Sequence, residues 1–253
     1  MLVFKMANIQ TRMRRHDDVI ITQIGTPGWA RTYLVHDATT SEAVLVDPVW
    51  DHIDEDLLTV SEAGLTLTAV LGTHTHADHI TAGFVLSERL NLPFVMYDGA
   101  RTAGVTHMVT DRATWRVGQG VLRFHAAPGH TADSMIIEGE GAIMTGDFLF
   151  NGDSGVGRDD LPGGSLEAHW EALSVLQRFD DETLVLSGHA PPGEPPRTLG
   201  WNRSNNPILR MASLEEYRAW QEREWERLGD VSRMPVALPA NTEGRVPDSL
   251  PWA

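Results

Sequence analysis

The amino-acid sequence predicts an α/β fold in which two β-sheets are sandwiched between helices, with a helical appendage at the C-terminal end. Short runs of β-branched and other apolar residues alternate with turn residues, and amphipathic helical stretches separate several of them. A chain of 253 residues with 42% hydrophobic residues can form a sizeable core, which excludes global disorder. This order of elements is typical of a layered domain.

The first half of the chain contributes strands and two helices. The expected strands, rich in β-branched residues, are 19–24, 32–36, 43–47 and the short buried strand 68–71. One helix is expected at residues 51–63. A second is expected from about residue 80 to 90, where Ile80, Phe84 and Leu90 are among the apolar positions.

The second half continues with strands, a helix and a different tail. The expected strands are 94–97, 121–126, 134–138, 142–145 and 183–187. A helix is expected at residues 165–179, because Leu166, Trp170 and Leu173 lie roughly on one face.

Residues 190–253 form the expected appendage. A proline-rich loop at 191–196 comes first, and Ser213 with Glu216 then forms a capping box that opens a helix reaching about Leu228. Residues 235–253 are expected to be extended coil. We therefore predict one domain over residues 17–253, preceded by a flexible basic tail at residues 1–16.

Composition excludes several classes of function. The formal net charge is −15, so the chain repels phosphate backbones and nucleic acid is not an expected partner. There is no cysteine, so any metal must be held by nitrogen and oxygen. No run of 18 apolar residues occurs, so no membrane span is expected and the default location is the cytoplasm.

The strongest motif is Thr-His-Thr-His-Ala-Asp-His at residues 73–79, directly after the buried strand that ends at Leu71. Because strand side chains repeat every two residues, His74 and His76 can point the same way. Imidazole and carboxylate groups suit zinc, iron or manganese. A histidine-rich turn without metal is the alternative, and four ligand-type side chains within six residues disfavour it.

Three further strands end in the same manner. Each is followed by a glycine, which permits a sharp turn, and then by a ligand-type residue. These residues are His130, Asp147 and His189. Core packing does not explain three such coincidences beside the first motif, so the sequence predicts a metal site on loops at strand ends.

These seven residues resemble the metallo-β-lactamase superfamily in identity and order. The resemblance implies an αβ/βα four-layer sandwich with the site at one edge, between the sheets. In two-metal members, one ion would be held by His74, His76 and His130, the other by Asp78, His79 and His189, and Asp147 would bridge them.

Other segments resemble persulfide dioxygenases, or sulfur dioxygenases, of the glyoxalase-II-like branch. The similarity runs from about Thr22 to Gly244 and includes these pieces: Arg-Thr-Tyr-Leu-Val at 31–35, Gly-Arg-Asp-Asp at 157–160, Asn206-Pro207, Ser-Leu-Glu-Glu-Tyr at 213–217 and Pro-Ala-Asn at 239–241. The branch implies a single Fe(II) per chain, held by His74, His130 and Asp147. Two histidines and one carboxylate leave positions open for substrate and O₂.

In this one-iron interpretation the other four residues, His76, Asp78, His79 and His189, surround the ligands and orient them and water. Asp78 and Arg158 are the expected catalytic residues. Arg158 either holds a substrate carboxylate or braces the metal loop through an acidic partner.

The chain departs from the branch at three places. Ser134 stands where the branch often has cysteine, and Ala190-Pro191 replaces a frequent Asp-Tyr. Leu-Pro-Gly-Gly at residues 161–164 is more similar to glyoxalase-II-like hydrolases. These departures concern the substrate and leave the metal ligands intact.

The resemblance therefore implies an enzyme that oxidises glutathione persulfide, or a similar low-molecular-weight persulfide, with O₂ to sulfite at one non-haem iron. The alternative is a hydrolase with two zinc ions that cleaves a thioester or lactone. A binding module that keeps only the fold would have lost ligands, and none is lost. The expected partners are the small thiol or persulfide and O₂, with a homodimer as an assembly compatible with the sequence.

Overall fold

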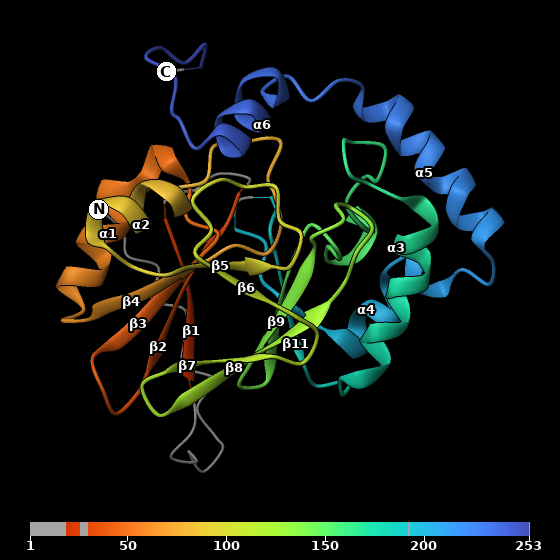
Figure 1. Ribbon diagram of the computed structural model, residues 1–253. Helices are drawn as coiled ribbons and strands as arrows, with labels where there is room; N and C mark the ends of the chain where they lie inside the picture. The colour runs from red at the N-terminus through yellow and green to blue at the C-terminus, as the bar shows by residue number, and fades with distance from the viewer. Residues whose placement is uncertain (1–18, 26–29, 192, 253) are drawn as a thin grey trace.

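Two β-sheets face each other and helices cover the outer surface of each, as Figure 1 shows. The computed structural model describes residues 19–25, 30–191 and 193–252, so the tail expected at residues 1–16 lies outside the described residues. Within these ranges the architecture is the predicted four-layer α/β sandwich. The strand order in the first sheet is β1-β2-β3-β4-β5-β6, and in the second β12-β11-β10-β9-β8-β7.

The first sheet is antiparallel from β1 to β3 and parallel from β3 to β6. Its strands are β1 (Val19–Ile24), β2 (Thr32–Asp37), β3 (Glu42–Val46), β4 (Thr66–Leu71), β5 (Phe94–Tyr97) and β6 (His107–Val109). In β3, Val44 and Val46 face the other sheet, whereas Ala43 and Leu45 face the helices. Burial on both faces explains why this strand is a continuous apolar run.

The second sheet is antiparallel except for the parallel pair β10 and β11. Its strands are β7 (Thr114–Val117), β8 (Gly120–Ala126), β9 (Met135–Gly139), β10 (Ala142–Gly146), β11 (Leu184–Ser187) and β12 (Arg197–Thr198). The loop between β8 and β9 meets the loop after β4, where the Met135 N–H donates to the Thr73 carbonyl at 2.9 Å. Loops from both sheets therefore converge at one edge of the sandwich.

Helices pack on the outside of each sheet through separate apolar clusters. The helices on the first sheet are α1 (Ile53–Glu62), α2 (Gly83–Leu90) and α6 (Met234–Glu243). Those on the second are α3 (Leu166–Ala172), α4 (Leu199–Asn205) and α5 (Leu214–Leu228). The C-terminal segment thus contributes helices to both outer layers, with α5 and α6 joined across one end of the molecule (Figure 1).

Helix α6 corrects the expectation of extended coil over residues 235–253. Pro235 lies in the first helical turn, where an N–H would have no partner within the helix, so it is tolerated. Pro239 inside the helix is unfavourable locally, yet Ala237 and Ala240 are buried against the first sheet. Tertiary burial therefore overrides the local preference of the prolines.

Other differences concern where two helices begin or end and which short elements were not predicted. The helix expected at 165–179 ends as α3 at Ala172 and continues as a 3₁₀-helix at Leu173–Arg178. Helix α2 begins at Gly83, because the preceding residues belong to the loop after β4. Besides α6, the strands and α-helices that the pattern did not predict are β6, β7, β12 and α4. Each has seven residues or fewer, too few for a hydrophobic period to be recognised.

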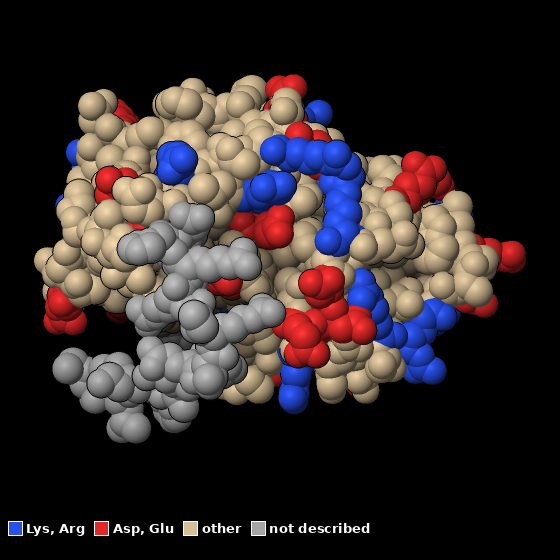
Figure 2. Space-filling model, turned by 90° about the horizontal axis from the view of Figure 1, so that it is seen from below, with Lys and Arg blue, Asp and Glu red and all other residues tan. Residues whose placement is uncertain are grey.

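The surface carries charges of both signs. Figure 2 shows basic and acidic side chains close to one another near the centre of one face, so the described residues visible there form no broad surface of one sign. Among the described helices, none combines the length and apolar character needed to cross a bilayer.

Candidate metal centre

The seven residues predicted for the site lie together at the edge where the loops of both sheets converge. His74, His76, Asp78 and His79 follow β4, and His130 lies in the β8–β9 loop. Asp147 and His189 follow the parallel strands β10 and β11. Each strand end thus delivers its ligand-type side chain to one place, while the sheets hold the loops in position.

His74, His130 and Asp147 form the first of two groups of ligand-type residues. One ligand-type atom from each lies within 4.8 Å of the others. The Asp147 Oδ2 atom is 3.9 Å from His74 Nε2 and 3.7 Å from His130 Nε2. These three residues are the ones that the one-iron interpretation selects, and all are buried.

His76, Asp78 and His79 form a second group of the same kind. His189 lies between the two groups, with its Nε2 atom 3.2 Å from Asp78 Oδ2 and 3.5 Å from Asp147 Oδ2. The geometry therefore accommodates one ion in the first group, or two ions with one in each group.

Several buried polar atoms of this cluster have no hydrogen-bond partner among the described residues. They are His74 Nε2, His76 Nδ1, His79 Nε2 and Asp147 Oδ1. Leaving such atoms unpaired is costly in a protein interior. Their convergence, and their mixture of imidazole nitrogen and carboxylate oxygen, fits a bound divalent metal.

Hydrogen bonds set which nitrogen of two histidines faces the cluster. His130 Nδ1–H donates to the carbonyl of Arg158 at 2.6 Å. Thr73 Oγ1 donates to Asp47, so His74 Nδ1–H donates to Thr73 Oγ1 at 3.0 Å. In the neutral form, each ring therefore presents an unprotonated Nε2 towards Asp147, which is the tautomer that a metal requires.

Asp47 is a site residue that sequence reasoning missed. It follows β3, adopts a left-handed backbone conformation with φ 49°, and is buried. Its carboxylate accepts from the N–H and hydroxyl of Thr73 at 2.7 Å each and lies 3.2 Å from His76 Nε2. An aspartate directly after an apolar strand, as in residues 43–48, was the available signal.

Burial and charge set opposite protonation states for neighbouring histidines. Burial lowers the pKa of His74 well below its usual value, and His76 and His130 lower it further. Burial also lowers the pKa of His76, but the carboxylates of Asp47, Asp78 and Asp147 together raise it to about 9. Without a bound metal, His74 therefore favours the neutral form and His76 the protonated form beside Asp47, and a metal at His76 would have to displace that proton.

Two glycines permit the close approach of the loops. Gly146 has φ +51°, and a Cβ there would lie 2.3 Å from Thr73 Oγ1. A Cβ on Gly188 would lie 2.6 Å from Asp147 Oδ1. The sequence predicted a turn role for both; Gly146 has the positive φ of such a turn, whereas Gly188 is required for space.

The C-terminal helices hold the metal loops. Buried Asn241 of α6 donates through Nδ2 to the carbonyls of His76 and His79, both at 2.9 Å, and its Oδ1 accepts from the Thr81 N–H at 2.9 Å. Its role depends on α6, which the sequence did not predict. In the sequence, Asn241 stood out only as part of the Pro-Ala-Asn segment that resembles persulfide dioxygenases.

Arg158 is the residue for which two roles were expected. Its Nε and Nη2 donate to the two carboxylate oxygens of Asp160 at 2.6 Å each, and Nη1 donates to the Gly229 carbonyl at 2.6 Å. Nearby, Gln221 of α5 donates to the Gly157 carbonyl at 3.1 Å. The segment that accepts the His130 hydrogen bond is thus fastened to α5 on both sides.

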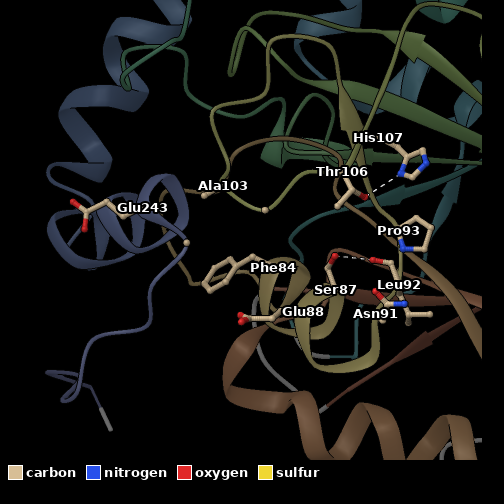
Figure 3. Close-up of a pocket in the computed structure, with 12 residues that line it drawn as sticks. Phe84, Ser87, Glu88, Asn91, Leu92, Pro93, Ala103, Thr106, His107 and Glu243 are labelled. Carbon is tan, nitrogen blue, oxygen red and sulfur yellow. Dashed lines mark hydrogen bonds between the residues drawn. The ribbon is translucent and has the colours of Figure 1, made fainter.

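A cavity of about 350 Å³ opens onto the cluster. Asp78, His130, Asp147 and His189 line one side, and residues of α5 line the other. A larger cavity of about 720 Å³ lies elsewhere, beside Phe84, Glu88 and Glu243 (Figure 3). None of the seven residues lines that second cavity, so the smaller one is the candidate substrate site.

Known proteins resemble this chain over most of its length. The crystal structure of ETHE1 from Myxococcus xanthus is 36% identical, covers 88% of this chain and 98% of that chain, and superimposes with a TM-score of 0.81. Human mitochondrial persulfide dioxygenase ETHE1 is 31% identical over 74% of this chain and 73% of its own length.

Hydrolases are similar as well. The hydroxyacylglutathione hydrolase of Chromohalobacter salexigens is 27% identical over 76% of this chain and 88% of its own length. The beta-lactamase hydrolase-like protein of Xylella fastidiosa strain 9a5c is 29% identical over 85% of this chain, which spans only 58% of that relative.

The family itself follows from the match to its model. The metallo-beta-lactamase superfamily model covers residues 26–189, which include every residue of the cluster. Together with the four-layer sandwich and the ETHE1 structure, this shows that the chain belongs to the metallo-beta-lactamase superfamily and resembles its persulfide dioxygenases.

Proposed function

We propose that this protein oxidises a low-molecular-weight persulfide, with glutathione persulfide as the reference substrate, using O₂ at one iron ion in the cytoplasm. The observation that carries the proposal is the compact group of His74, His130 and Asp147, whose ligand-type atoms lie within 4.8 Å of one another. Two imidazoles and one carboxylate are the donor set of oxygen-using non-haem iron enzymes. The similarity to persulfide dioxygenases extends over most of the chain.

These three residues would hold Fe(II), and the unpaired His74 Nε2 and Asp147 Oδ1 fit that role. When bound, the iron supplies redox chemistry and positions O₂ and the persulfide side by side. In the net reaction, the outer sulfur is oxidised to sulfite and O₂ accepts its four electrons. Water supplies the third oxygen of sulfite, and the carrier leaves as its thiol with release of two protons.

The protein side chains prepare the site for this reaction. Arg158, through its carbonyl, fixes the tautomer of His130. Asp78 is half-buried and lies in the cavity 3.2 Å from His189. Burial opposes its charge, but His79 and His189 hold its pKa well below the usual value, so it stays a carboxylate that can orient His189 and accept a hydrogen bond from substrate or water. The guanidinium of Arg158 is held by Asp160, which supports the bracing role over direct binding of a substrate carboxylate.

A hydrolase with two metal ions is the second candidate. The group of His76, Asp78 and His79 favours it, because these residues could hold a second ion beside the first. Two zinc ions would activate water for attack on a thioester or lactone carbonyl.

One parallel assay separates the two candidates. Anaerobically purified protein, loaded with iron, is tested for O₂ uptake and sulfite release from glutathione and alkyl persulfides, and for hydrolysis of S-lactoylglutathione and an acyl-homoserine lactone. We expect equal amounts of O₂ consumed and sulfite formed, both lost in Asp147→Ala. Hydrolysis without any O₂ uptake would refute the proposal in favour of the hydrolase.

A further inference from the structure

Besides the metal residues, the cavity beside the cluster is lined by many apolar side chains. They are Phe150, whose ring centroid lies 6.2 Å from that of His189, and Val156, Leu161, Trp220, Leu228 and Val231. Val156 is buried, and the others are half-buried except Leu228, which is 50% exposed at the rim. A substrate whose reacting end lies at the metal residues would therefore place its other end against hydrocarbon.

The basic side chains lining the cavity are already paired. Among the described residues, these are Arg158 and Arg227. Arg158 is held by both oxygens of Asp160, and Arg227 donates through Nε and Nη2 to Glu224 Oε2 at 2.9 and 2.5 Å. Each guanidinium thus has a carboxylate of the protein where a substrate carboxylate would need to bind.

The charge balance disfavours an anionic carrier. The two arginines are neutralised by Asp160 and Glu224, and the whole chain has a net charge of −15. A carrier with carboxylates would have to compete with Asp160 for the largely buried Arg158 guanidinium or with Glu224 for the exposed Arg227. A carboxylate left unpaired against the apolar side chains would be costly. An uncharged hydrocarbon carrier has no such cost and gains from burial.

We propose, on the basis of the function proposed above, that this cavity selects an alkyl or aryl persulfide with an uncharged, apolar carrier over the anionic glutathione persulfide. The apolar wall formed by α5 and its flanking loop binds the carrier, and the persulfide end reaches the His74, His130 and Asp147 group. Leu161, Trp220, Leu228 and Val231 are the residues that determine this specificity.

Binding of the product thiols tests the preference without turnover. Iron-loaded protein is titrated calorimetrically under anaerobic conditions with hexanethiol and with glutathione. We expect hexanethiol to bind at least roughly tenfold more tightly, the effect of about two buried methylene groups. Equal affinity, or tighter binding of glutathione, would overturn the proposal.

A pair of variants places the preference in this cavity. Leu228→Arg adds a second guanidinium beside Glu224 at the rim, so that one positive charge there exceeds what Glu224 neutralises. It should reduce the affinity ratio of hexanethiol to glutathione by about three- to fivefold. The matched control, Leu58→Arg, adds the same charge at a 58% exposed position of α1 outside the cavity and should leave the ratio unchanged. An equal change in both variants would contradict the assignment.

Turnover distinguishes this inference from the proposed function. The rate of O₂ uptake with hexyl persulfide should exceed the rate with glutathione persulfide by a factor similar to the ratio of the two thiol affinities. If neither persulfide consumes O₂ while the thiol preference and the Leu228→Arg effect persist, the proposed function fails and the selectivity of the cavity stands.

Discussion

At the scale of single residues, the surroundings of each histidine in the cluster distinguish the candidate metal ligands from the histidines that lie beside them. His130 is buried, its tautomer is set by the Arg158 carbonyl, and its Nε2 lies 3.7 Å from Asp147 Oδ2. His189 is partly exposed and lies against both Asp78 and Asp147. The two residues look alike in the sequence, each following a glycine at a strand end, but the structure gives them different surroundings.

We predict different metal retention in variants of these two histidines. His130→Ala should lose iron and activity together, because it removes one of three ligands. His189→Ala should keep close to one iron per chain, with affinity or activity reduced about 10–100-fold. Elemental analysis after anaerobic desalting is the measurement. Equal loss of iron from both variants would contradict the one-iron assignment.

Asp56 on α1 offers a residue-scale prediction about pH. Its side chain is fully buried, and both oxygens lack a hydrogen-bond partner among the described residues. Burial, with a smaller contribution from Glu55, raises its pKa from 3.8 to about 7. The folded protein therefore holds a proton that the unfolded chain has released, so this stabilising contribution is present below pH 3.8 and is lost as the pH rises through about 7.

Asp56→Asn should flatten this dependence. Between pH 3.8 and about 7, the free energy of unfolding of the unmodified protein should fall by up to about 1.4 kcal/mol per pH unit relative to the variant. Denaturant unfolding across this range is the measurement. Asp54→Asn is the control, because that side chain is 93% exposed on the same helix and should behave like the unmodified protein. A difference that does not vary with pH would refute the prediction.

At the scale of elements, the two C-terminal helices hold loops that belong to the first part of the chain. Helix α6 fastens the loop after β4 through Asn241, and α5 fastens the segment after β10. Tyr217 and Gln221 of α5 both donate to Asp159 Oδ2, at 3.0 and 3.1 Å. The tail is thus a support for the candidate metal centre, far from it in sequence and adjacent in space.

Asn241→Asp should weaken the site without replacing any candidate ligand. The change replaces two N–H donors by a carboxylate that faces the His76 and His79 carbonyls, so the loop must shift. We expect iron affinity to fall about 10–100-fold, measured by competition with a chelator. Thr242→Ala is the control, because its hydroxyl bonds only within the helix, to the Leu238 and Pro239 carbonyls. Equal effects of the two changes would contradict the inference that Asn241 holds the loop after β4 in place.

At the scale of the whole molecule, the candidate metal residues come from both sheets. His74 follows a strand of the first sheet, whereas His130 and Asp147 follow strands of the second. A bound ion would therefore connect the two halves of the sandwich as well as serve catalysis, because a ligand that binds only the folded state stabilises it.

Removal of the metal should lower thermal stability. At a free-metal concentration of about 100 to 1,000 times Kd, binding contributes about 2.7–4.1 kcal/mol, which corresponds to a fall in Tm of roughly 5–15 °C on chelation. Calorimetry of the iron-loaded and chelated protein measures it. Asp147→Ala should show no response to the chelator, and an unchanged Tm in the unmodified protein would argue against a metal bound at the sheet edge.

The sequence by itself determined the fold class and the residues of the cluster. The relevant patterns are the apolar strands, the His-x-His-x-Asp-His motif and the glycine before His130, Asp147 and His189. Each involves only residues that are close in sequence, so it can be recognised without the tertiary structure. The strands and helices that they predict appear in the structure, most with shifted ends. The family relationship was recognisable for the same reason.

Only the tertiary structure decided what surrounds those residues. The contact of Asp47 with His76, the hydrogen bonds of Asn241 to the loop after β4 and the bond from Arg158 to the Gly229 carbonyl all join positions distant in sequence, so no local pattern could reveal them. Helix α6 is the clearest case, because its prolines predict coil and only burial against the first sheet stabilises the helix. Local preference is worth little energy per residue, and packing against the rest of the molecule outweighs it.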